Sequence, residues 1–295
     1  MPIESIIPDE QILTDAGFYW RERSGVKVLV CHPLEEAGFA NGFSTRIGGV
    51  SAITQEPPAL AGGVQAGTDL SLAGFDEDSP ENIFENRRRF LGAFDGAYTF
   101  ASVWQVHGNN IKVVRTRAEA ESSDEKFDGI VSDLPNILVG VKTADCVPVL
   151  IGDPQRNTFA AVHAGWKGTS QSIVSKAVEK MAGIYGSDPS DFICALGPAA
   201  LCGNYEIGPD VIEAFAASFA DHEKYLSPTR EGHARIDLHL ANEDQLASCG
   251  VKREAIFKAP FCTIDRTDLF FSYRVENAKY GKTGRLMSVI GLAEN

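Results

Sequence analysis

The sequence comprises 295 residues, of which 44% are hydrophobic, and this is enough to build a sizeable buried core. Its formal net charge of -13 at pH 7 argues against nucleic acids and anionic membranes as partners, because both require a basic face. An anionic substrate would need cations concentrated locally. The first 15 residues lack the segments of a signal peptide and no run of 18 apolar residues occurs, so we expect a cytoplasmic protein.

The six cysteines are few for this length and include no C-x-x-C pair. In a reducing compartment they are expected to be core thiols or metal ligands rather than disulfides. No internal repeat or low-complexity linker marks a boundary in the chain. Residues 1–295 are therefore predicted to form a single catalytic domain, whose oligomeric state the sequence leaves open.

The N-terminal part contains a predicted strand and two loops. Residues 26–30 form the strand, and in the first loop Arg46 is followed by Gly48 and Gly49. This loop either brings the guanidinium and the backbone to a ligand or is a surface turn with a solvated arginine. Residues 52–67 contain two adjacent prolines and a Gly-Gly pair, which predicts a mobile loop.

A helix is expected to begin at the Ser-Pro-Glu sequence of residues 79–81, which supplies an N-cap, a proline at the first helical position and an early acid. We interpret the arginines at positions 87–89 as the solvated face of this helix. Residues 102–108 then resemble a strand that closes in a turn, and this turn contains His107.

Three apolar runs form the centre of the sequence, at residues 137–141, 147–151 and 159–162. Short apolar runs separated by turn residues are typical of buried strands. Cys146 and His163 thus lie at strand ends, where a rigid scaffold aims side chains into a cleft.

A glycine-rich turn follows, in which Lys167 lies between Gly165 and Gly168, and a helical pattern covers residues 170–183. Free N–H groups at a helix start favour anions, so we expect an anion beside Lys167. The remaining sequence predicts helices that begin near residues 209 and 236, and strands at 192–196, 256–259, 270–274 and 286–292.

Two imidazoles and one thiol are expected at strand-to-loop junctions, namely His107, Cys146 and His163. Two nitrogens and a sulfur, with a fourth position left for water, suit catalytic zinc. The same residues also allow nucleophilic catalysis by a Cys146 thiolate with either histidine as its base. Adjacent Asp145 would raise the pKa of the thiol, and a bound metal would offset that effect.

Copper chemistry can be judged from the histidine content. Four coppers with imidazole ligands would need roughly eight or more histidines, and the sequence has six. A multicopper centre therefore does not fit, although a single copper ion could replace zinc in vitro, because copper binds such ligands more tightly.

Several short motifs occur in order along the chain: QVHG at 105–108, TADCVPVL at 143–150, AAVHAGWKGT at 160–169, LGP at 196–198, YEIGPDV at 205–211, and FFSYR with TGR between 270 and 285. Together they resemble the family long labelled multicopper polyphenol oxidase or laccase domain, whose members are now understood as zinc-containing purine nucleoside phosphorylases with adenosine deaminase activity. The resemblance extends from Phe43 nearly to the C-terminus, whereas residues 52–67 have no counterpart in the family pattern.

The resemblance implies an α+β fold, with mixed β-sheets packed as a sandwich and flanking helices, similar to toxin deamidases and cysteine hydrolases. It implies that His107, Cys146 and His163 bind zinc. The expected reaction is phosphorolysis of adenosine, inosine, guanosine or methylthioadenosine to free base and ribose 1-phosphate or its thio analogue. Hydrolytic deamination of adenosine is expected at the same zinc site, so the expected partners are purine nucleosides and phosphate.

Further roles are expected around this site. Asp145 or Glu206 would transfer protons, with Glu206 in the substrate site, and Arg46 and Lys167 would bind phosphate. The alternatives are a cysteine-dependent amide hydrolase with Cys146 as nucleophile, a phenol oxidase in which copper replaces zinc, and a non-catalytic binding module stabilised by zinc.

Overall fold

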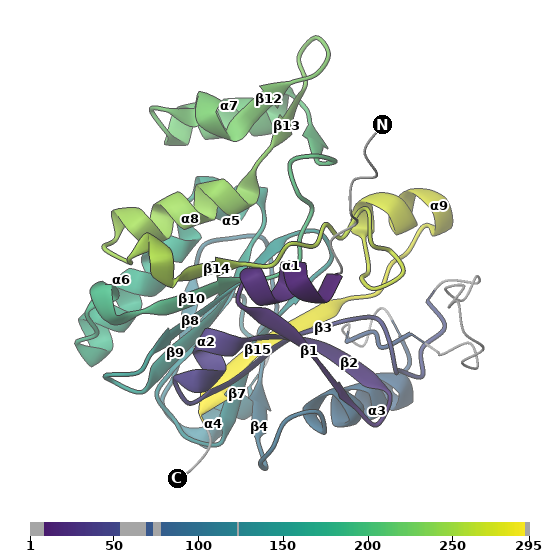
Figure 1. The fold of residues 1–295 in the computed structure, drawn as a ribbon, viewed down its shortest axis with the longest axis vertical. Helices are drawn as coiled ribbons and strands as arrows, with labels where there is room; N and C mark the ends of the chain where they lie inside the picture. Colours follow the sequence, from purple (N-terminus) through teal and green to yellow (C-terminus); the bar gives the residue numbers. More distant parts are fainter. Residues whose placement is uncertain (1–8, 54–68, 73–77, 123, 293–295) are drawn as a thin grey trace.

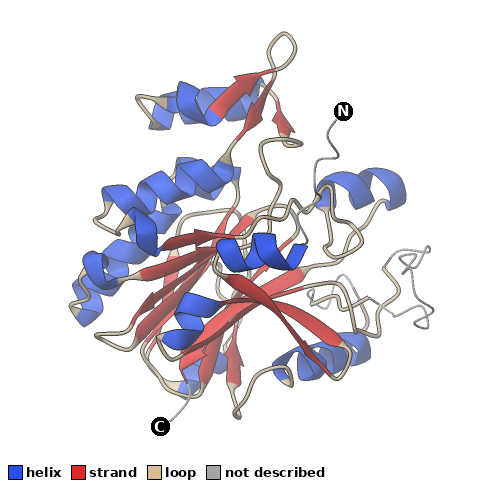
Figure 2. Ribbon diagram, in the orientation of Figure 1, coloured by secondary structure: helices blue, strands red, loops and turns tan. Residues whose placement is uncertain are grey.

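The computed structural model describes residues 9–53, 69–72, 78–122 and 124–292. Nearly all of the loop predicted at residues 52–67 lies outside these ranges. Two mixed six-stranded sheets form the centre of the molecule, and helices pack on their outer faces (Figures 1 and 2). The expected α+β fold with mixed sheets is therefore confirmed.

The first sheet has the strand order β1-β2-β3-β15-β7-β4. Strands β4 and β7 run parallel, and the other neighbours run antiparallel. The strands are β1 (Phe18–Arg23), β2 (Val26–Cys31), β3 (Phe39–Ser44), β15 (Leu286–Leu292), β7 (Ile137–Thr143) and β4 (Thr99–Ala101).

The second sheet has the strand order β14-β10-β8-β9-β6-β5, with parallel pairs at its two edges. Its strands are β14 (Ile256–Lys258), β10 (Ile193–Leu196), β8 (Val147–Asp153), β9 (Thr158–Ala164), β6 (Gly129–Ser132) and β5 (Ile111–Val114). A small third sheet joins β11 (Glu206–Ile207), β13 (Ala234–Ile236) and β12 (Leu226–Pro228).

Apolar side chains from both large sheets meet in one core, exemplified by Val139 of β7 and Leu150 of β8. The outer face of the first sheet packs against Phe90 of α3. The outer face of the second sheet packs against α6 and α8. The helices are α1 (Asp9–Asp15), α2 (His32–Glu36), α3 (Pro80–Leu91), α4 (Arg117–Glu121), α5 (Trp166–Ser170), α6 (Ile173–Tyr185), α7 (Pro209–Ser218), α8 (Leu238–Ser248) and α9 (Ala278–Tyr280).

The predicted start of α3 is confirmed, because the Ser79 side chain accepts a hydrogen bond from the N–H of Asn82 and Pro80 occupies the first helical position. Short 3₁₀ turns occur at Pro189–Asp191, His222–Tyr225 and Arg253–Ala255. None of the helices among the described residues is long and apolar enough to cross a membrane.

Two predicted strands are wrong. Strand β4 ends at Ala101, and residues 102–108 form a loop. Here the side-chain amide of Gln105, rather than the backbone, hydrogen-bonds to the N–H and C=O of Lys142 in β7, both at 2.7 Å. Residues 270–274 also form no strand. Phe270 and Phe271 are apolar because they are buried in the core, and Ser272 caps a π-helical turn at Tyr273–Asn277.

Candidate metal centre

The site lies where the chain passes from one sheet to the other. Strand β7 ends at Thr143 in the first sheet, three residues follow, and β8 begins at Val147 in the second. Cys146 is the last of these residues. Since Val147 pairs with Ala164 and Pro148 with His163 in the β8–β9 ladder, this pairing brings Cys146 beside the end of β9.

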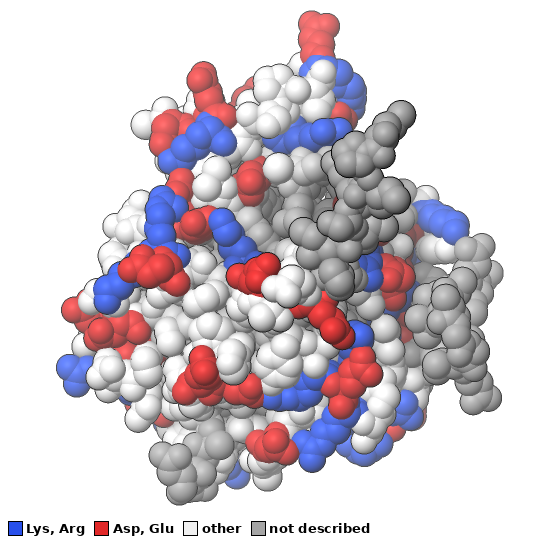
Figure 3. Space-filling view, viewed as in Figure 1, with Lys and Arg blue, Asp and Glu red and all other residues white. Residues whose placement is uncertain are grey.

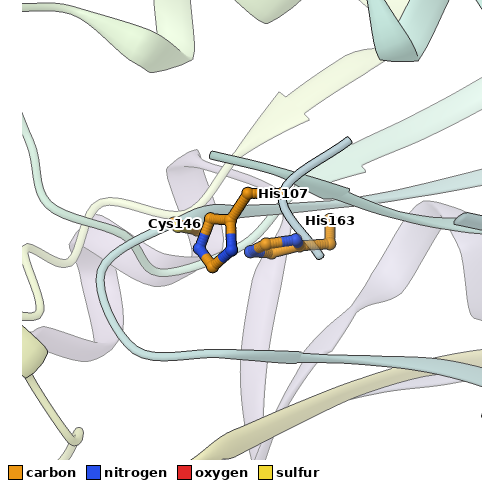
Figure 4. Close-up of side chains that lie close together, drawn as sticks. All are labelled: His107, Cys146 and His163. Carbon is orange, nitrogen blue, oxygen red and sulfur yellow. The ribbon is translucent and has the colours of Figure 1, made fainter. Parts of the chain in front are cut away.

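The three expected ligands lie together (Figure 4). The potential ligand atoms of His107, Cys146 and His163 all lie within 4.8 Å of one another. The two imidazole rings meet edge to face, with centroids 4.8 Å apart. His107 reaches the cluster from the loop between β4 and β5, where its φ of 57° is left-handed.

Asp128 holds both histidines and was not singled out from the sequence. Its buried carboxylate accepts a hydrogen bond from Nδ1 of His163 at 2.9 Å. It also accepts the backbone N–H groups of Val106, His107 and Gly108, at 3.2, 2.9 and 2.7 Å. These bonds bend the loop that carries His107. Because an ionised carboxylate only accepts, Nδ1 of His163 carries the proton, which leaves Nε2 for a metal.

Gly165 leaves the space that the cluster occupies. A Cβ added at this position would lie 2.9 Å from Sγ of Cys146 and 3.3 Å from Cδ2 of His107. The glycine-rich turn thus permits close approach of the backbone to the ligands. The turn opens α5, which has only five residues, so the predicted anion site at a helix start lacks a helix of useful length.

The charges of Cys146 and His163 depend on each other. Burial raises the pKa of Cys146, but the adjacent imidazoles outweigh burial and lower it to about 6. Burial lowers the pKa of His163, but the thiolate and the Asp128 carboxylate raise it to about 9. Burial opposes ionisation of Asp128 as well, yet the hydrogen bond from His163 and the backbone N–H groups hold its pKa below the usual range. Without metal the thiol is therefore ionised at neutral pH.

The donor set fits one zinc ion. A thiolate and two imidazole nitrogens leave the fourth position of a tetrahedral ion open, as in catalytic zinc sites. Asp128 fixes the tautomer of His163 in the way that carboxylates orient metal-binding histidines. Among the described residues, His107, Cys146 and His163 are the His, Cys, Asp or Glu side chains that lie close enough to one another to hold an ion.

The cluster opens into a cavity of about 920 Å³, a size typical of small-molecule sites. Among the described residues, five cations line the cavity and outnumber the two carboxylates, Asp124 and Asp145. The cations are Arg87, Lys142, Lys167, Arg274 and Arg285, and the aromatic lining residues include Trp104, Trp166, Tyr205 and Tyr273. By contrast, acidic and basic side chains are interspersed on the face drawn in Figure 3. The cavity therefore concentrates positive charge in an acidic protein.

The family model for multi-copper polyphenol oxidoreductase laccase matches residues 40–293. The chain belongs to this laccase family. A relative from Deinococcus radiodurans named purine nucleoside phosphorylase is 36% identical over 252 residues, which cover 85% of this chain and 88% of the relative. Another, adenosine deaminase RL5 from an unknown prokaryotic organism, is 33% identical over 186 residues, 61% of this chain and 71% of the relative.

A solved structure resembles this chain over nearly its whole length. The crystal structure of the Bacillus licheniformis hypothetical protein YfiH is similar to this laccase-family chain with a TM-score of 0.81 and 28% identity, covering 93% of this chain and 98% of that one. The family resemblance expected from the motifs is therefore confirmed.

Lys167 and Asp145 both line the cavity of this laccase-family protein. Lys167 is exposed, with Nζ 5.3 Å from the centroid of the Trp166 ring. The buried carboxylate of Asp145 accepts hydrogen bonds at 2.7 Å from Oγ1 of Thr263 and from the backbone N–H of Arg274. Burial outweighs these bonds and raises the pKa of Asp145.

Arg46 does not line the cavity of the laccase-family protein, contrary to its expected contact with phosphate. It is 4% exposed, and its guanidinium forms ion pairs with Asp69 at 2.9 Å and Glu276 at 2.7 Å. The guanidinium also lies over the Phe271 ring at 4.6 Å. Two carboxylates and a ring occupy the fork that would have bound the anion, so this arrangement favours a structural role.

Glu206 also points away from the cavity. Its carboxylate accepts hydrogen bonds from Thr229 at 2.9 Å and from Arg230 at 3.0 Å, both in the segment between β12 and β13. Only its backbone contributes to the site, because its carbonyl accepts a hydrogen bond from Arg274 at 2.8 Å. A role for the Glu206 side chain in proton transfer or substrate binding is therefore not supported by its position.

Proposed function

We propose that this protein is a zinc-dependent purine nucleoside phosphorylase that also deaminates adenosine at the same site. The observation that carries the proposal is the His107, Cys146 and His163 cluster at the wall of a cavity rich in cations and aromatic rings. The names of the two relatives support the same substrate class. Zinc, when bound by these residues, supplies a Lewis acid that makes water nucleophilic near neutral pH.

The residues around the cluster can bind and orient a nucleoside. Trp104 and Tyr273 line the cavity and are 59% and 52% exposed, so both rings can contact a purine, and the Arg285 guanidinium lies over the Tyr273 ring, 6.0 Å from its centroid. Stacking of a base on an aromatic ring contributes about 1–3 kcal/mol. Lys167 and Arg274 add positive charge that draws phosphate into the cavity, and the oxygens of the bound phosphate would stabilise the oxocarbenium-like transition state of phosphorolysis.

Asp145 is the better candidate for the proton carrier than Glu206. It lines the cavity one residue from Cys146, and burial raises its pKa, so it holds a proton more readily than an exposed aspartate. The bonds from Thr263 and from the N–H of Arg274 fix the orientation of its carboxyl group. In the proposed deamination Asp145 would take a proton from the attacking water and pass it to the purine, so that the carboxyl group returns to its starting form.

The test is metal analysis of the purified full-length protein together with product assays on inosine and adenosine, with and without phosphate. We expect one zinc per chain, phosphate-dependent release of base from inosine, and ammonia from adenosine. Replacement of any one ligand, as in Cys146→Ser, His107→Ala or His163→Ala, should abolish zinc binding and turnover. Base release at the same rate without phosphate would refute phosphorolysis and leave hydrolysis.

His233→Ala is the matched control, because this histidine binds the carbonyl of Glu231 in a turn remote from the cluster. It should retain zinc and both activities. Full activity of any ligand variant in metal-free buffer would overturn the zinc assignment.

A second function is favoured by one observation, the arrangement of Cys146, His163 and Asp128. A thiolate beside an imidazole that is oriented by a carboxylate is the arrangement of a cysteine hydrolase. If the protein is an amide hydrolase, an amide-directed electrophile should label Cys146 in the metal-free protein, and zinc should inhibit turnover. Cys249 is a half-buried free cysteine outside the cavity lining and serves as the labelling control.

A further inference from the structure

Three cations of the cavity lie apart from the ligand cluster and come from three different elements. Arg87 belongs to α3, Lys142 to β7, and Arg285 immediately precedes β15. Each is half-buried, whereas neighbouring Arg88 has a side chain that is 72% exposed. The arginine run of α3 was interpreted as a solvated face, and Arg87 departs from that interpretation because it turns into the cavity.

The strand register places these cations on one face of the first sheet. Lys142 and Met287 are partners in the β7–β15 ladder, and directly opposed residues point to the same face. Arg285 is two residues before Met287 and so shares this face. Arg87 and Met287 line the same small apolar pocket, in which the Arg87 guanidinium lies 6.0 Å from the centroid of Phe100. The three cations therefore lie near buried Met287, at the end of this face that borders the cavity.

The backbone behind each cation is held by polar side chains. The Gln105 amide binds both backbone groups of Lys142. The N–H of Arg285 donates to Oγ of Ser71 at 3.2 Å. Helix α3 is fixed by buried Asn86, whose amide donates to Oγ of Ser51 at 2.7 Å and to the carbonyl of Ser71 at 2.8 Å. The backbone positions of the three residues are thus set before any ligand arrives, which lowers the cost of binding one.

We propose that Arg87, Lys142 and Arg285 form a subsite for a phosphoryl anion, either inorganic phosphate or the phosphate group of a nucleotide. Two guanidinium groups and one ammonium group supply donors for the oxygens of such an anion, three in a phosphate ester and four in inorganic phosphate. Lys142 is four residues before Cys146, so the subsite opens into the cavity that the candidate metal centre shares. The identity of the ligand rests on the proposed function, whereas the charge and the shape of the subsite do not.

The nearest carboxylates do not oppose this assignment. The carboxylate oxygens of Asp145 already accept hydrogen bonds from Oγ1 of Thr263 and from the backbone N–H of Arg274. Asp124 is exposed at the rim of the cavity. A phosphoryl group beside the three cations therefore meets predominantly positive charge, in contrast to the net charge of -13 of the whole chain.

The test is calorimetric titration of inorganic phosphate, inosine 5′-monophosphate and inosine, each added alone, into the full-length zinc-loaded protein. The variants are Arg87→Gln, Lys142→Gln and Arg285→Gln, and Arg88→Gln on the solvent side of α3 is the matched control. Loss of one charge-assisted hydrogen bond should raise the Kd of the phosphoryl ligand about tenfold or more. The Kd of inosine and the melting temperature should match those of the control.

The ligand that weakens identifies the source of the anion. Weaker binding of inorganic phosphate assigns the co-substrate to the subsite, and weaker binding of the monophosphate alone assigns the phosphate of a nucleotide. Unchanged Kd values for both phosphoryl ligands in all three variants would overturn the proposal. Because binding is measured without turnover, a protein that binds phosphate here but never releases base would refute the proposed function and leave the subsite intact.

Discussion

Asp128 is the residue whose replacement tests the construction of the site most directly. Each of its carboxylate oxygens accepts two N–H groups: Oδ1 from Nδ1 of His163 and the backbone of His107, Oδ2 from the backbones of Val106 and Gly108. Asparagine offers one accepting oxygen, and its NH₂ group would face two N–H donors. Asp128→Asn therefore removes two hydrogen bonds to a charged acceptor, each contributing about 1.5–3 kcal/mol.

Both candidate histidine ligands depend on these bonds, His163 through its ring and His107 through its loop. Replacement of groups that orient metal ligands typically lowers affinity about 10–100-fold, or about 1.4–2.7 kcal/mol. We expect this loss of zinc affinity in Asp128→Asn, together with a lower free energy of unfolding. Competition with a chromophoric zinc chelator gives the affinity, and urea unfolding gives the stability.

Asp153→Asn is the control. Asp153 is also fully buried, and its Oδ1 accepts the backbone N–H groups of Gln155 and Arg156 in the turn between β8 and β9. This variant should lose stability and keep its zinc affinity. Zinc affinity of Asp128→Asn within about twofold of the wild type would show that the carboxylate does not orient the ligands.

Three further changes have defined outcomes. In the metal-free protein, the pKa of Cys146 is lowered to about 6, so its contribution to stability should be lost as the pH falls through 6. The pKa of His163 is raised to about 9, so its contribution should be lost as the pH rises through 9. Urea unfolding across this range should show a plateau that Cys146→Ser removes, and a persistent plateau contradicts the ion pair. Gly165→Ala should displace the Cys146 thiol and abolish zinc binding. Gly183→Ala is the control and should bind zinc normally, because a Cβ added there has no neighbouring atom within 4 Å. Equal zinc binding by both variants would show that Gly165 is not crowded. Arg46→Lys should lower the free energy of unfolding by about 3–5 kcal/mol, because a buried carboxylate loses its partner. The Kd of inorganic phosphate should not change. Weaker phosphate binding by a stable Arg46→Lys protein would instead place Arg46 in the phosphate site.

The pattern of apolar residues correctly predicted the strands that are buried in the core. The apolar runs that became β7, β8 and β9 are fully buried strands, and their ends carry Cys146 and His163. The run at residues 270–274 was misleading, because burial of Phe270 and Phe271 makes the same apolar pattern without a strand. Hydrophobic patterning reports burial, and the hydrogen-bond ladder is a separate property.

Charged residues were harder to place, because their roles depend on partners distant in the sequence. The sequence predicted that Arg46 binds phosphate, whereas in the structure its guanidinium is paired with the carboxylate of Glu276, 230 residues away. Asp128 precedes β6 with no histidine or cysteine near it in the sequence, and its partner His163 is 35 residues away. Arg87 and Arg88 are adjacent on one helix and face opposite environments. Only the register of the strands and the helix packing reveal such contacts.

The short crossing from β7 to β8 also bears on how the molecule folds. Three residues join the two large sheets, so the sheets cannot slide past each other without displacing Cys146. Cys146 and His163 lie at the second sheet, whereas the loop of His107 is held to the first sheet by Gln105, which binds Lys142, so the full ligand set depends on slow, non-local contacts. Uptake of metal should therefore follow the docking of the sheets, and the rate at which a refolding chain becomes able to capture zinc would time that docking event.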